Sequence, residues 1–291
     1  MKRLLLILLA GCAASPRALP GDLRERVRDT LAKTGRHWAV YYKDLDTGAA
    51  WETNADEPFH AASTIKVFVM IKILQDVHDG RYSLDDAIPV TDTFPSFVNG
   101  TPFKVDATAA EVRDAVGKTM TMRALLEYMI TVSDNMATDN LIHQAGEAAA
   151  INACAARYGA TKCTLLRYIQ DVAAFDAGYS SKVEARDFGT LMERIWRGEV
   201  VSREASEEML AVMSRLKTKR FIPAGLPDGV RVAHKTGWFE GVCNDVALVY
   251  REGRAPVVMV FLSRDLPDDA AAERAIAECS RLLYEHAVQA K

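Results

Sequence analysis

The sequence lacks several features that mark broad classes of protein. Its 36 lysines and arginines face 39 aspartates and glutamates, a formal net charge of −3, so no basic excess exists to bind a nucleic-acid backbone. The apolar run at residues 4–10 is far shorter than the roughly 20 residues of a transmembrane helix. Internal repeats, a Gly-x-Ser-x-Gly motif and histidine pairs at metal-ligand spacing are absent. With 49% hydrophobic and 26% charged residues, the composition is that of a globular protein.

The first twelve residues have the pattern of an export signal. Two basic residues precede the apolar run 4–10, and small residues follow it. The stretch 9–12 (Leu-Ala-Gly-Cys) also resembles a bacterial lipobox, in which cleavage leaves Cys12 as the lipidated first residue. We therefore expect an exported, periplasmic or cell-envelope lipoprotein of a bacterium, attached to a membrane only through Cys12. Plain secretion is the alternative.

Four further cysteines follow Cys12: Cys154, Cys163, Cys243 and Cys279. An exported compartment permits disulfides, and four cysteines allow three full pairings. Proximity in the chain favours Cys154 with Cys163, and simple buried thiols are the alternative.

Strand-like segments lie near both ends of the chain, and helix-like segments lie between them. Strand character is found at 38–42, 49–53, 230–238, 245–250 and 256–262. Helical periodicity or helix signals occur at 23–31, 63–77, 121–131, 137–144, 185–197, 203–216 and 268–290. After a tether over 1–20, we expect 21–65 and 220–291 to form one sheet domain. A helical domain, 66–219, is inserted with a loop near 161–182, and the active site is expected between the two domains.

The segment Ser63-Thr64-Ile65-Lys66 pairs a hydroxyl with an amine at the start of a helix that is apolar almost all round. Residues three apart lie on one helix face, so the hydroxyl can act as a nucleophile and the amine as its base. The helix N-terminus adds backbone N–H groups that stabilise an oxyanion. Burial would lower the pKa of Lys66, because desolvation disfavours the ammonium form.

This motif is informative only as part of an ordered set. Ser-x-x-Lys occurs again at 214–217 and Lys-Thr-Gly at 33–35, but Ser133-Asp134-Asn135 occurs once. The order Ser63 to Lys66, then 133–135, then Lys235 to Gly237, at intervals of 70 and 102 residues, resembles the class A serine β-lactamases and the penicillin-binding acyltransferases. The stretch 120–142 (MTMRALLEYMITVSDNMATDNLI) is similar to class A around its middle motif. The resemblance covers essentially all of the chain after residue 20.

The resemblance implies an α/β (α+β) fold of the class A type, with an antiparallel sheet flanked by helices and an inserted all-helical domain. It implies no cofactor and no metal, a small β-lactam or D-Ala-D-Ala peptide as substrate, and a monomer. It assigns Ser63 as the nucleophile, Lys66 as a base or proton relay and Ser133 as a proton shuttle. Asn135 would hold Lys66 and the substrate amide, and Lys235 and Thr236, of the substrate-binding motif that ends at Gly237, would bind the substrate carboxylate. The N–H groups of Ser63 and Trp238 would form the oxyanion hole.

One departure from the class A pattern concerns the residue that activates water to release the acyl group. Class A enzymes use a glutamate on an Ω-shaped loop, and the corresponding position here is Ile169. The nearest acid is Asp171, with Arg167 close by. Either Asp171 replaces the glutamate, or it pairs with Arg167 or caps a turn, and the acyl-enzyme then decays slowly.

Three functions follow from this reasoning. The first is hydrolysis of β-lactams through a Ser63 acyl-enzyme. The second is a D-Ala-D-Ala carboxypeptidase or related cell-wall peptide amidase, which the missing glutamate suggests. The third is a penicillin-binding or sensor protein that is acylated once and keeps the adduct. Two further residues are expected to have structural and not chemical roles. Asp134, the middle residue of its motif, would brace the motif loop, and His234 points to the opposite face of the strand from Lys235.

Overall fold

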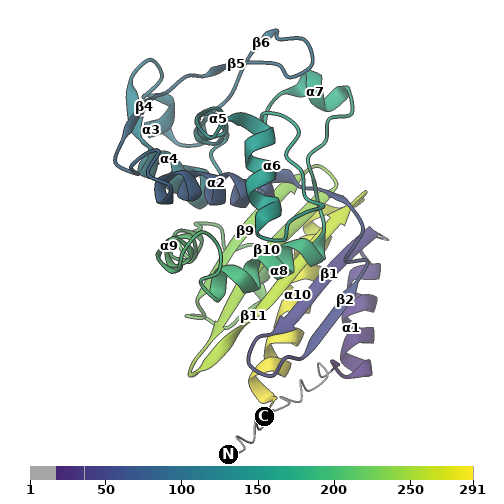
Figure 1. Cartoon of the computed structure of the whole chain (residues 1–291). Coiled ribbons are helices and arrows are strands. Elements are labelled where there is room, and N and C mark those ends of the chain that lie inside the picture. Colours follow the sequence, from purple (N-terminus) through teal and green to yellow (C-terminus); the bar gives the residue numbers. More distant parts are fainter. Residues whose placement is uncertain (1–17, 36, 291) are drawn as a thin grey trace, which may run out of the picture.

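The structure, a computed structural model, describes residues 18–35 and 37–290. Its centre is a five-stranded antiparallel sheet with the strand order β2-β1-β11-β10-β9 (Figure 1). The early strands are β1 (His37–Asp44) and β2 (Ala50–Thr53), and the late ones are β9 (Val232–Phe239), β10 (Val242–Arg251) and β11 (Arg254–Arg264). The pairing of β1 with β11 joins the two ends of the chain in one sheet, which confirms the predicted fold class.

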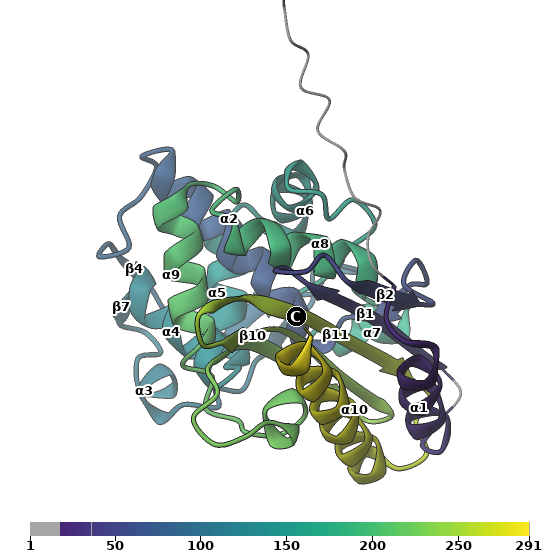
Figure 2. The ribbon, with the colours of Figure 1, turned by 90° about the horizontal axis from the view of Figure 1, so that it is seen from below.

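Helices cover both faces of this sheet. The helices α1 (Gly21–Ala32) and α10 (Asp269–Gln289) lie on one face, and α8 (Ala185–Trp196) lies on the other (Figure 2). Because strand side chains alternate, Val40 and Tyr42 pack toward α1 and α10, whereas Ala39 and Tyr41 pack toward α8. A Cβ atom at Gly189 would lie 2.2 Å from the Tyr41 ring, so the missing side chain lets α8 rest on the sheet.

The remaining helices and short strands lie between β2 and β9 in the chain, and most of the helices gather above the sheet in Figure 1. The helices are η1 (Ala62–Ile65), α2 (Lys66–His78), α3 (Ala110–Arg113), α4 (Met122–Thr131), α5 (Asn135–Gln144), α6 (Glu147–Arg157), α7 (Val172–Asp176), α9 (Arg203–Met213) and η2 (Ile222–Gly225). The short strand pairs are β3 (Phe59–His60) with β8 (Lys182–Val183), β4 (Ala87–Pro89) with β7 (Thr119–Thr121), and β5 (Thr93–Pro95) with β6 (Pro102–Lys104).

The segment predicted as a buried helix from Ser63 is buried but begins differently. Residues 62–65 form the 3-10 turn η1, and the α-helix starts at Lys66. Residues 64–76 are buried without a gap, as expected for a helix that is apolar almost all round. The predicted loop 161–182 contains the short helix α7 and ends at β8. Residues 89–106 form a second long connection, which contains the β5–β6 hairpin. The domain boundaries stay a prediction.

Two other expectations concern the cysteines and the membrane. All four cysteines of the described chain are buried free thiols, so the favoured pairing of Cys154 with Cys163 is wrong and the alternative holds. Cys154 belongs to α6 and Cys163 to the loop after it, so closeness in sequence did not make them partners. None of the helices described is long and apolar enough to span a bilayer. Cys12 lies outside the described residues.

Candidate active site

Ser63, the predicted nucleophile, lies where β9 passes the 3-10 turn that precedes α2. A Cβ atom at Gly237 would lie 2.9 Å from the Ala61 carbonyl oxygen and 3.1 Å from the Ser63 backbone nitrogen. Only a glycine permits this approach, and Trp238, the next residue of β9, lines the same cavity as Ser63. From the neighbouring strand, Asn244 Nδ2 donates to the His60 carbonyl oxygen at 2.9 Å and so holds the same turn. The structure thus brings the two predicted oxyanion-hole residues together.

The three motifs meet at one hydroxyl group. Lys66 Nζ donates to Ser133 Oγ at 3.1 Å and to Asn135 Oδ1 at 2.8 Å. Lys235 Nζ donates to the same Ser133 Oγ at 3.1 Å and to the Thr236 carbonyl oxygen at 2.8 Å. Residues from α2, from the turn before α5 and from β9 therefore form one polar cluster, as the ordered motif set predicts.

The turn that presents Ser133 is locally strained and firmly held. Ser133 has φ = 58°, in the left-handed region, which costs a non-glycine residue about 1–3 kcal/mol. The next residue, Asp134, caps α5 by accepting the Ala137 N–H and also accepts the Ala109 N–H, both at 2.8 Å. In addition, Lys66 Nζ donates to the Ser133 carbonyl oxygen at 2.7 Å. The predicted bracing role of Asp134 is confirmed, and these bonds hold the strained turn.

Both amines are fully buried, and burial controls their charge. Desolvation lowers the pKa of Lys66 to about 7, and the negative charges of Asp139 and Asp134 oppose this shift. The pKa of Lys235 is lowered well below its ordinary value by burial and by the like charge of Lys66. A substantial fraction of Lys66 is therefore neutral near pH 7 and able to accept a proton, whereas an exposed lysine is almost entirely charged there.

The Ser133 hydroxyl can carry that proton onward. A hydroxyl group has one proton to donate and two lone pairs to accept. With both amines charged, Ser133 Oγ accepts from each of them. When one amine is neutral, the hydroxyl can instead donate to it, so a proton can pass between Lys66 and Ser133.

A cavity of about 420 Å³ opens beside this cluster. Ser63, Asn135 and Trp238 line it, together with residues of the 161–182 loop that include Ile169, Gln170 and Phe175. The rings of His60, Phe175 and Phe239 meet edge to face with centroids 5.5–5.7 Å apart. The cavity thus has a polar floor and an aromatic side, which suits a small ligand with both characters.

His60 belongs to the aromatic side and is not part of a nucleophilic pair. Its Nδ1 lies 2.7 Å from Ser180 Oγ. Burial, with a contribution from the positive charge of Arg167, lowers the pKa of His60 to about 4. The other histidine near a motif, His234, is buried behind Lys235 with Nδ1 3.1 Å from Asp245 Oδ1, as the strand alternation predicts.

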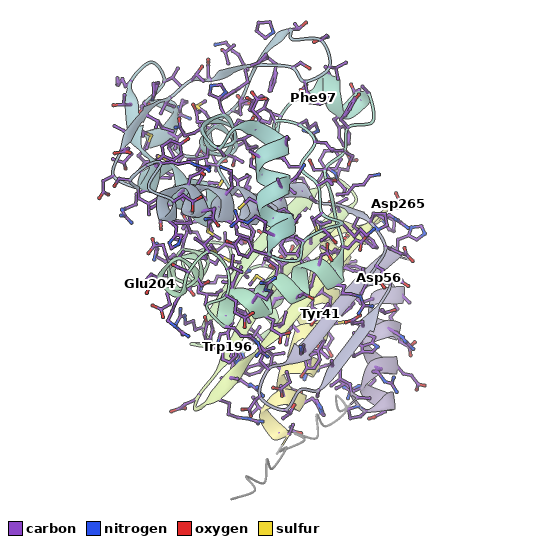
Figure 3. The ribbon with its side chains drawn as sticks, in the orientation of Figure 1. Tyr41, Asp56, Phe97, Trp196, Glu204 and Asp265 are labelled. Carbon is purple, nitrogen blue, oxygen red and sulfur yellow. The ribbon has the colours of Figure 1, made fainter. Side chains whose placement is uncertain are left out.

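Asp171 occupies a structural position. Its Oδ1 caps α7 by accepting the Ala174 N–H at 3.0 Å and also accepts the Ser96 hydroxyl at 2.8 Å. Its Oδ2 accepts the Phe97 N–H at 2.7 Å. The side chain is 1% exposed and does not line the cavity. This is the capping alternative, in which the carboxylate ties the β5–β6 hairpin to α7; Phe97, at the tip of this hairpin, is labelled in Figure 3.

We expect Asp171→Asn to lower the free energy of unfolding by about 1–3 kcal/mol, because the amide cannot accept all three hydrogen bonds in a buried place. Denaturation in urea measures this loss. Asp176→Asn, at an exposed end of the same helix, is the control and should stay within about 0.5 kcal/mol of the parent. A stable Asp171→Asn protein whose acyl adduct decays more slowly would instead support the catalytic alternative.

Asp139 was missed by the sequence reasoning. It lies one helical turn after Asn135 on α5 and is fully buried, and its Oδ1 accepts the Ile169 N–H at 2.8 Å. The sequence could have pointed to Asp139, because residues four apart share a helix face and Asn135, four residues earlier, belongs to a motif. Ile169, which the sequence resemblance matches to the class A glutamate, itself lines the cavity.

Comparisons with known proteins agree with this geometry. The family model described as "Beta-lactamase enzyme family" matches residues 22–287. A β-lactamase of Streptomyces fradiae is 27% identical over 270 residues, which cover 91% of this chain and 85% of the relative. A mutant of the last common ancestor of Gram-negative bacteria class A β-lactamase has a TM-score of 0.81 at 26% identity, with 92% and 100% of the two chains covered.

A further solved structure is similar and carries a bound group. It is a leucine-to-glutamate mutant of PBP-A in an acyl-enzyme complex with penicillin G. Its TM-score is 0.79 at 25% identity, and the match covers 94% of this chain and 98% of the other.

Proposed function

Because the chain belongs to the β-lactamase enzyme family, we propose that this serine hydrolase opens the amide bond of β-lactams through an acyl-enzyme on Ser63. The observation that carries the proposal is the convergence of Lys66 and Lys235 on the Ser133 hydroxyl beside a cavity lined by Ser63. The acyl-enzyme complex of the similar PBP-A mutant with penicillin G supports the substrate class.

In the proposed acylation, neutral Lys66 takes the proton of the Ser63 hydroxyl, directly or through one water. Ser63 Oγ then forms a bond to the lactam carbonyl carbon, and the oxyanion accepts hydrogen bonds from the N–H groups of Ser63 and Trp238. The C–N bond breaks, and the departing nitrogen takes a proton from the Ser133 hydroxyl, which Lys66 replaces. Lys235 and Thr236 attract the carboxylate of the substrate. Release requires water to form a bond to the acyl carbon while the bond to Ser63 Oγ breaks and that oxygen regains a proton.

A second function is favoured by one observation, namely that the loop presents no carboxylate where release would need a base. Ile169 and Gln170 line the cavity there, and both oxygens of Asp171 are engaged elsewhere. Slow release would make the protein a penicillin-binding protein or a cell-wall D-Ala-D-Ala carboxypeptidase. Fast hydrolysis of β-lactams would then be excluded.

Intact mass spectrometry over time after mixing with penicillin G separates these functions. We expect an adduct of one penicillin per chain, absent from Ser63→Ala, because only a nucleophile at that position can hold the acyl group. Decay of the adduct with continued penicillin consumption indicates a β-lactamase. A persistent adduct indicates a penicillin-binding protein, and D-Ala release from a D-Ala-D-Ala peptide identifies a carboxypeptidase. A parent protein that stays unmodified and leaves the penicillin unconsumed would overturn the proposal.

We also propose that the protein is exported and anchored through a lipid on Cys12. The support is the basic and apolar start of the chain followed by the lipobox-like stretch 9–12. Recovery of the protein in the membrane fraction of a bacterial host, and its loss from that fraction in Cys12→Ser, tests this. A Cys12→Ser protein that stays with the membrane would contradict it.

A further inference from the structure

The end of β9 that carries Trp238 lies at the edge of the sheet. β9 is an edge strand that pairs with β10 on one side, so on its other side the backbone groups are open to other contacts. Its last residues, Trp238 and Phe239, are 55% and 45% exposed, and both line the cavity. The proposed acylation assigns the backbone N–H group of Trp238 to the oxyanion hole. The position of this donor therefore depends on what holds the end of the strand.

Asp269, in the first turn of α10, joins the end of β9 to that helix. Its Oδ2 accepts the indole N–H of Trp238 at 3.0 Å, and its Oδ1 accepts the Gly241 N–H of the β9–β10 turn at 3.2 Å. The Gly241 carbonyl oxygen accepts a further bond, from the Leu266 N–H at 3.0 Å. The cross-strand partner of Trp238, Cys243, packs in the core cluster that contains α10 residues. One carboxylate thus holds both the strand end and the turn after it.

Phe239 contacts the active site from the opposite side. Successive strand residues point to opposite faces, and the Phe239 ring meets those of Phe175 and His60 edge to face, with centroids 5.5 and 5.6 Å apart. Apolar contacts of this kind have little directional preference, whereas hydrogen bonds to a carboxylate fix direction as well as distance. The orientation of the strand end is therefore set mainly from the α10 side.

We propose that Asp269 is a positioning residue of the active site: by holding the indole of Trp238 and the Gly241 N–H, it aims the backbone N–H of Trp238 at the oxyanion. The inference rests on the proposed function. An oxyanion donor acts over about 2.7–3.1 Å, so a small displacement of the strand weakens the transition state more than the substrate complex. Asp269 is not among the described residues that line the cavity, and it acts through these two groups alone.

The first test is Asp269→Ala, which removes both acceptors. Stopped flow with increasing concentrations of a chromogenic cephalosporin measures the maximal acylation rate and the half-saturating concentration separately. We expect the maximal rate to fall about tenfold, less than the roughly 10²–10³-fold loss of an entire oxyanion donor. The half-saturating concentration should stay within about twofold of the parent, because ground-state binding is kept. An unchanged maximal rate would overturn the inference.

The matched control is Asp268→Ala, one residue earlier. Asp268 caps α10 by accepting the Ala271 N–H at 3.0 Å, so this variant also weakens the start of the helix but leaves the contacts of Asp269 with β9 in place. We expect a lower midpoint of urea unfolding and the maximal acylation rate of the parent. Equal losses of rate in the two variants would show a general loosening of α10 and overturn the inference.

A double-mutant cycle shows whether Asp269 acts through the indole. Trp238→Phe keeps an aromatic ring and the backbone N–H but lacks the indole donor. We expect it to slow acylation, and we expect the variant with both changes to be no slower than Asp269→Ala alone, because the two side chains form one contact. Normal acylation in Trp238→Phe, or losses that multiply in the double variant, would overturn the inference.

A further measurement does not depend on acylation. Proton–nitrogen NMR detects the indole N–H of Trp238, which is assigned by its loss in Trp238→Phe. We expect its proton signal to move upfield in Asp269→Ala, because a hydrogen-bonded proton is deshielded, and to stay in place in Asp268→Ala. An unmoved signal in Asp269→Ala would overturn the inference. Failure of the proposed function is distinct, since it would appear as a parent protein that is not acylated although the indole signal still responds to Asp269→Ala.

Discussion

The Lys66→Met variant is expected to form the Ser63 acyl-enzyme about 10²–10⁴ times more slowly than the parent, the range that a positioned general base contributes. Methionine keeps an unbranched chain in the fully buried place of Lys66 but cannot accept the Ser63 proton. The fold should persist with some loss of stability, because the hydrogen bonds of Asp134 still hold the Ser133 turn although the bond from Lys66 to the Ser133 carbonyl oxygen is lost. Stopped-flow acylation and urea unfolding measure the two effects separately.

The control for this variant is Lys72→Met, a second buried lysine of α2. Lys72 pairs with Asp76, which also contacts Arg81, and none of these residues lines the cavity. We expect Lys72→Met to lose stability, because Asp76 loses a buried partner, and to keep its rate of acylation. Equal acylation rates in Lys66→Met and the parent would remove Lys66 from the mechanism.

The Ile169→Glu variant is expected to release the acyl group at least about 10²-fold faster than the parent. Ile169 lines the cavity, and the hydrogen bond from its N–H to Asp139 fixes its backbone. A carboxylate at this position could take a proton from an attacking water, which isoleucine cannot. The decay of the penicillin adduct by intact mass spectrometry gives the rate.

Ile169→Gln is the matched control, because the glutamine side chain is as long as that of glutamate and is also polar, but it cannot act as a base at neutral pH. Its adduct should persist as in the parent. If Ile169→Gln released the acyl group as fast as Ile169→Glu, a change in loop shape would be the cause. If the parent itself turned over rapidly, another base would already serve the reaction.

The catalytic motifs could be predicted from sequence because their chemistry is tied to short, ordered patterns. The spacing of Ser63 and Lys66 follows from one helical turn, and the alternation of a strand separates Lys235 from His234. The structure confirms that the motifs converge and that His234 is buried behind the site. The fold class followed in the same way, since strand patterns at both ends and helical patterns between them are local properties.

The roles of Asp171 and Asp139 could not be separated in the same way. Both carboxylates hold the 161–182 loop, but Asp171 accepts hydrogen bonds from the β5–β6 hairpin, whereas Asp139 accepts the Ile169 N–H from its place on α5. Their directions depend on how the loop, the hairpin and α5 pack together. The same limit applies to Cys154 and Cys163, which are close in sequence but are not bonded.

The sequence by itself determined the order of the motifs and the pairing of the predicted nucleophile Ser63 with Lys66, because local periodicity and residue chemistry are enough to define them. The tertiary structure alone decided that Lys66 and Lys235 are buried at one hydroxyl group, and it alone decided which elements each buried carboxylate joins. The physical reason is that charge interactions depend on distance and burial in space. Neither quantity can be obtained from the positions of residues along the chain.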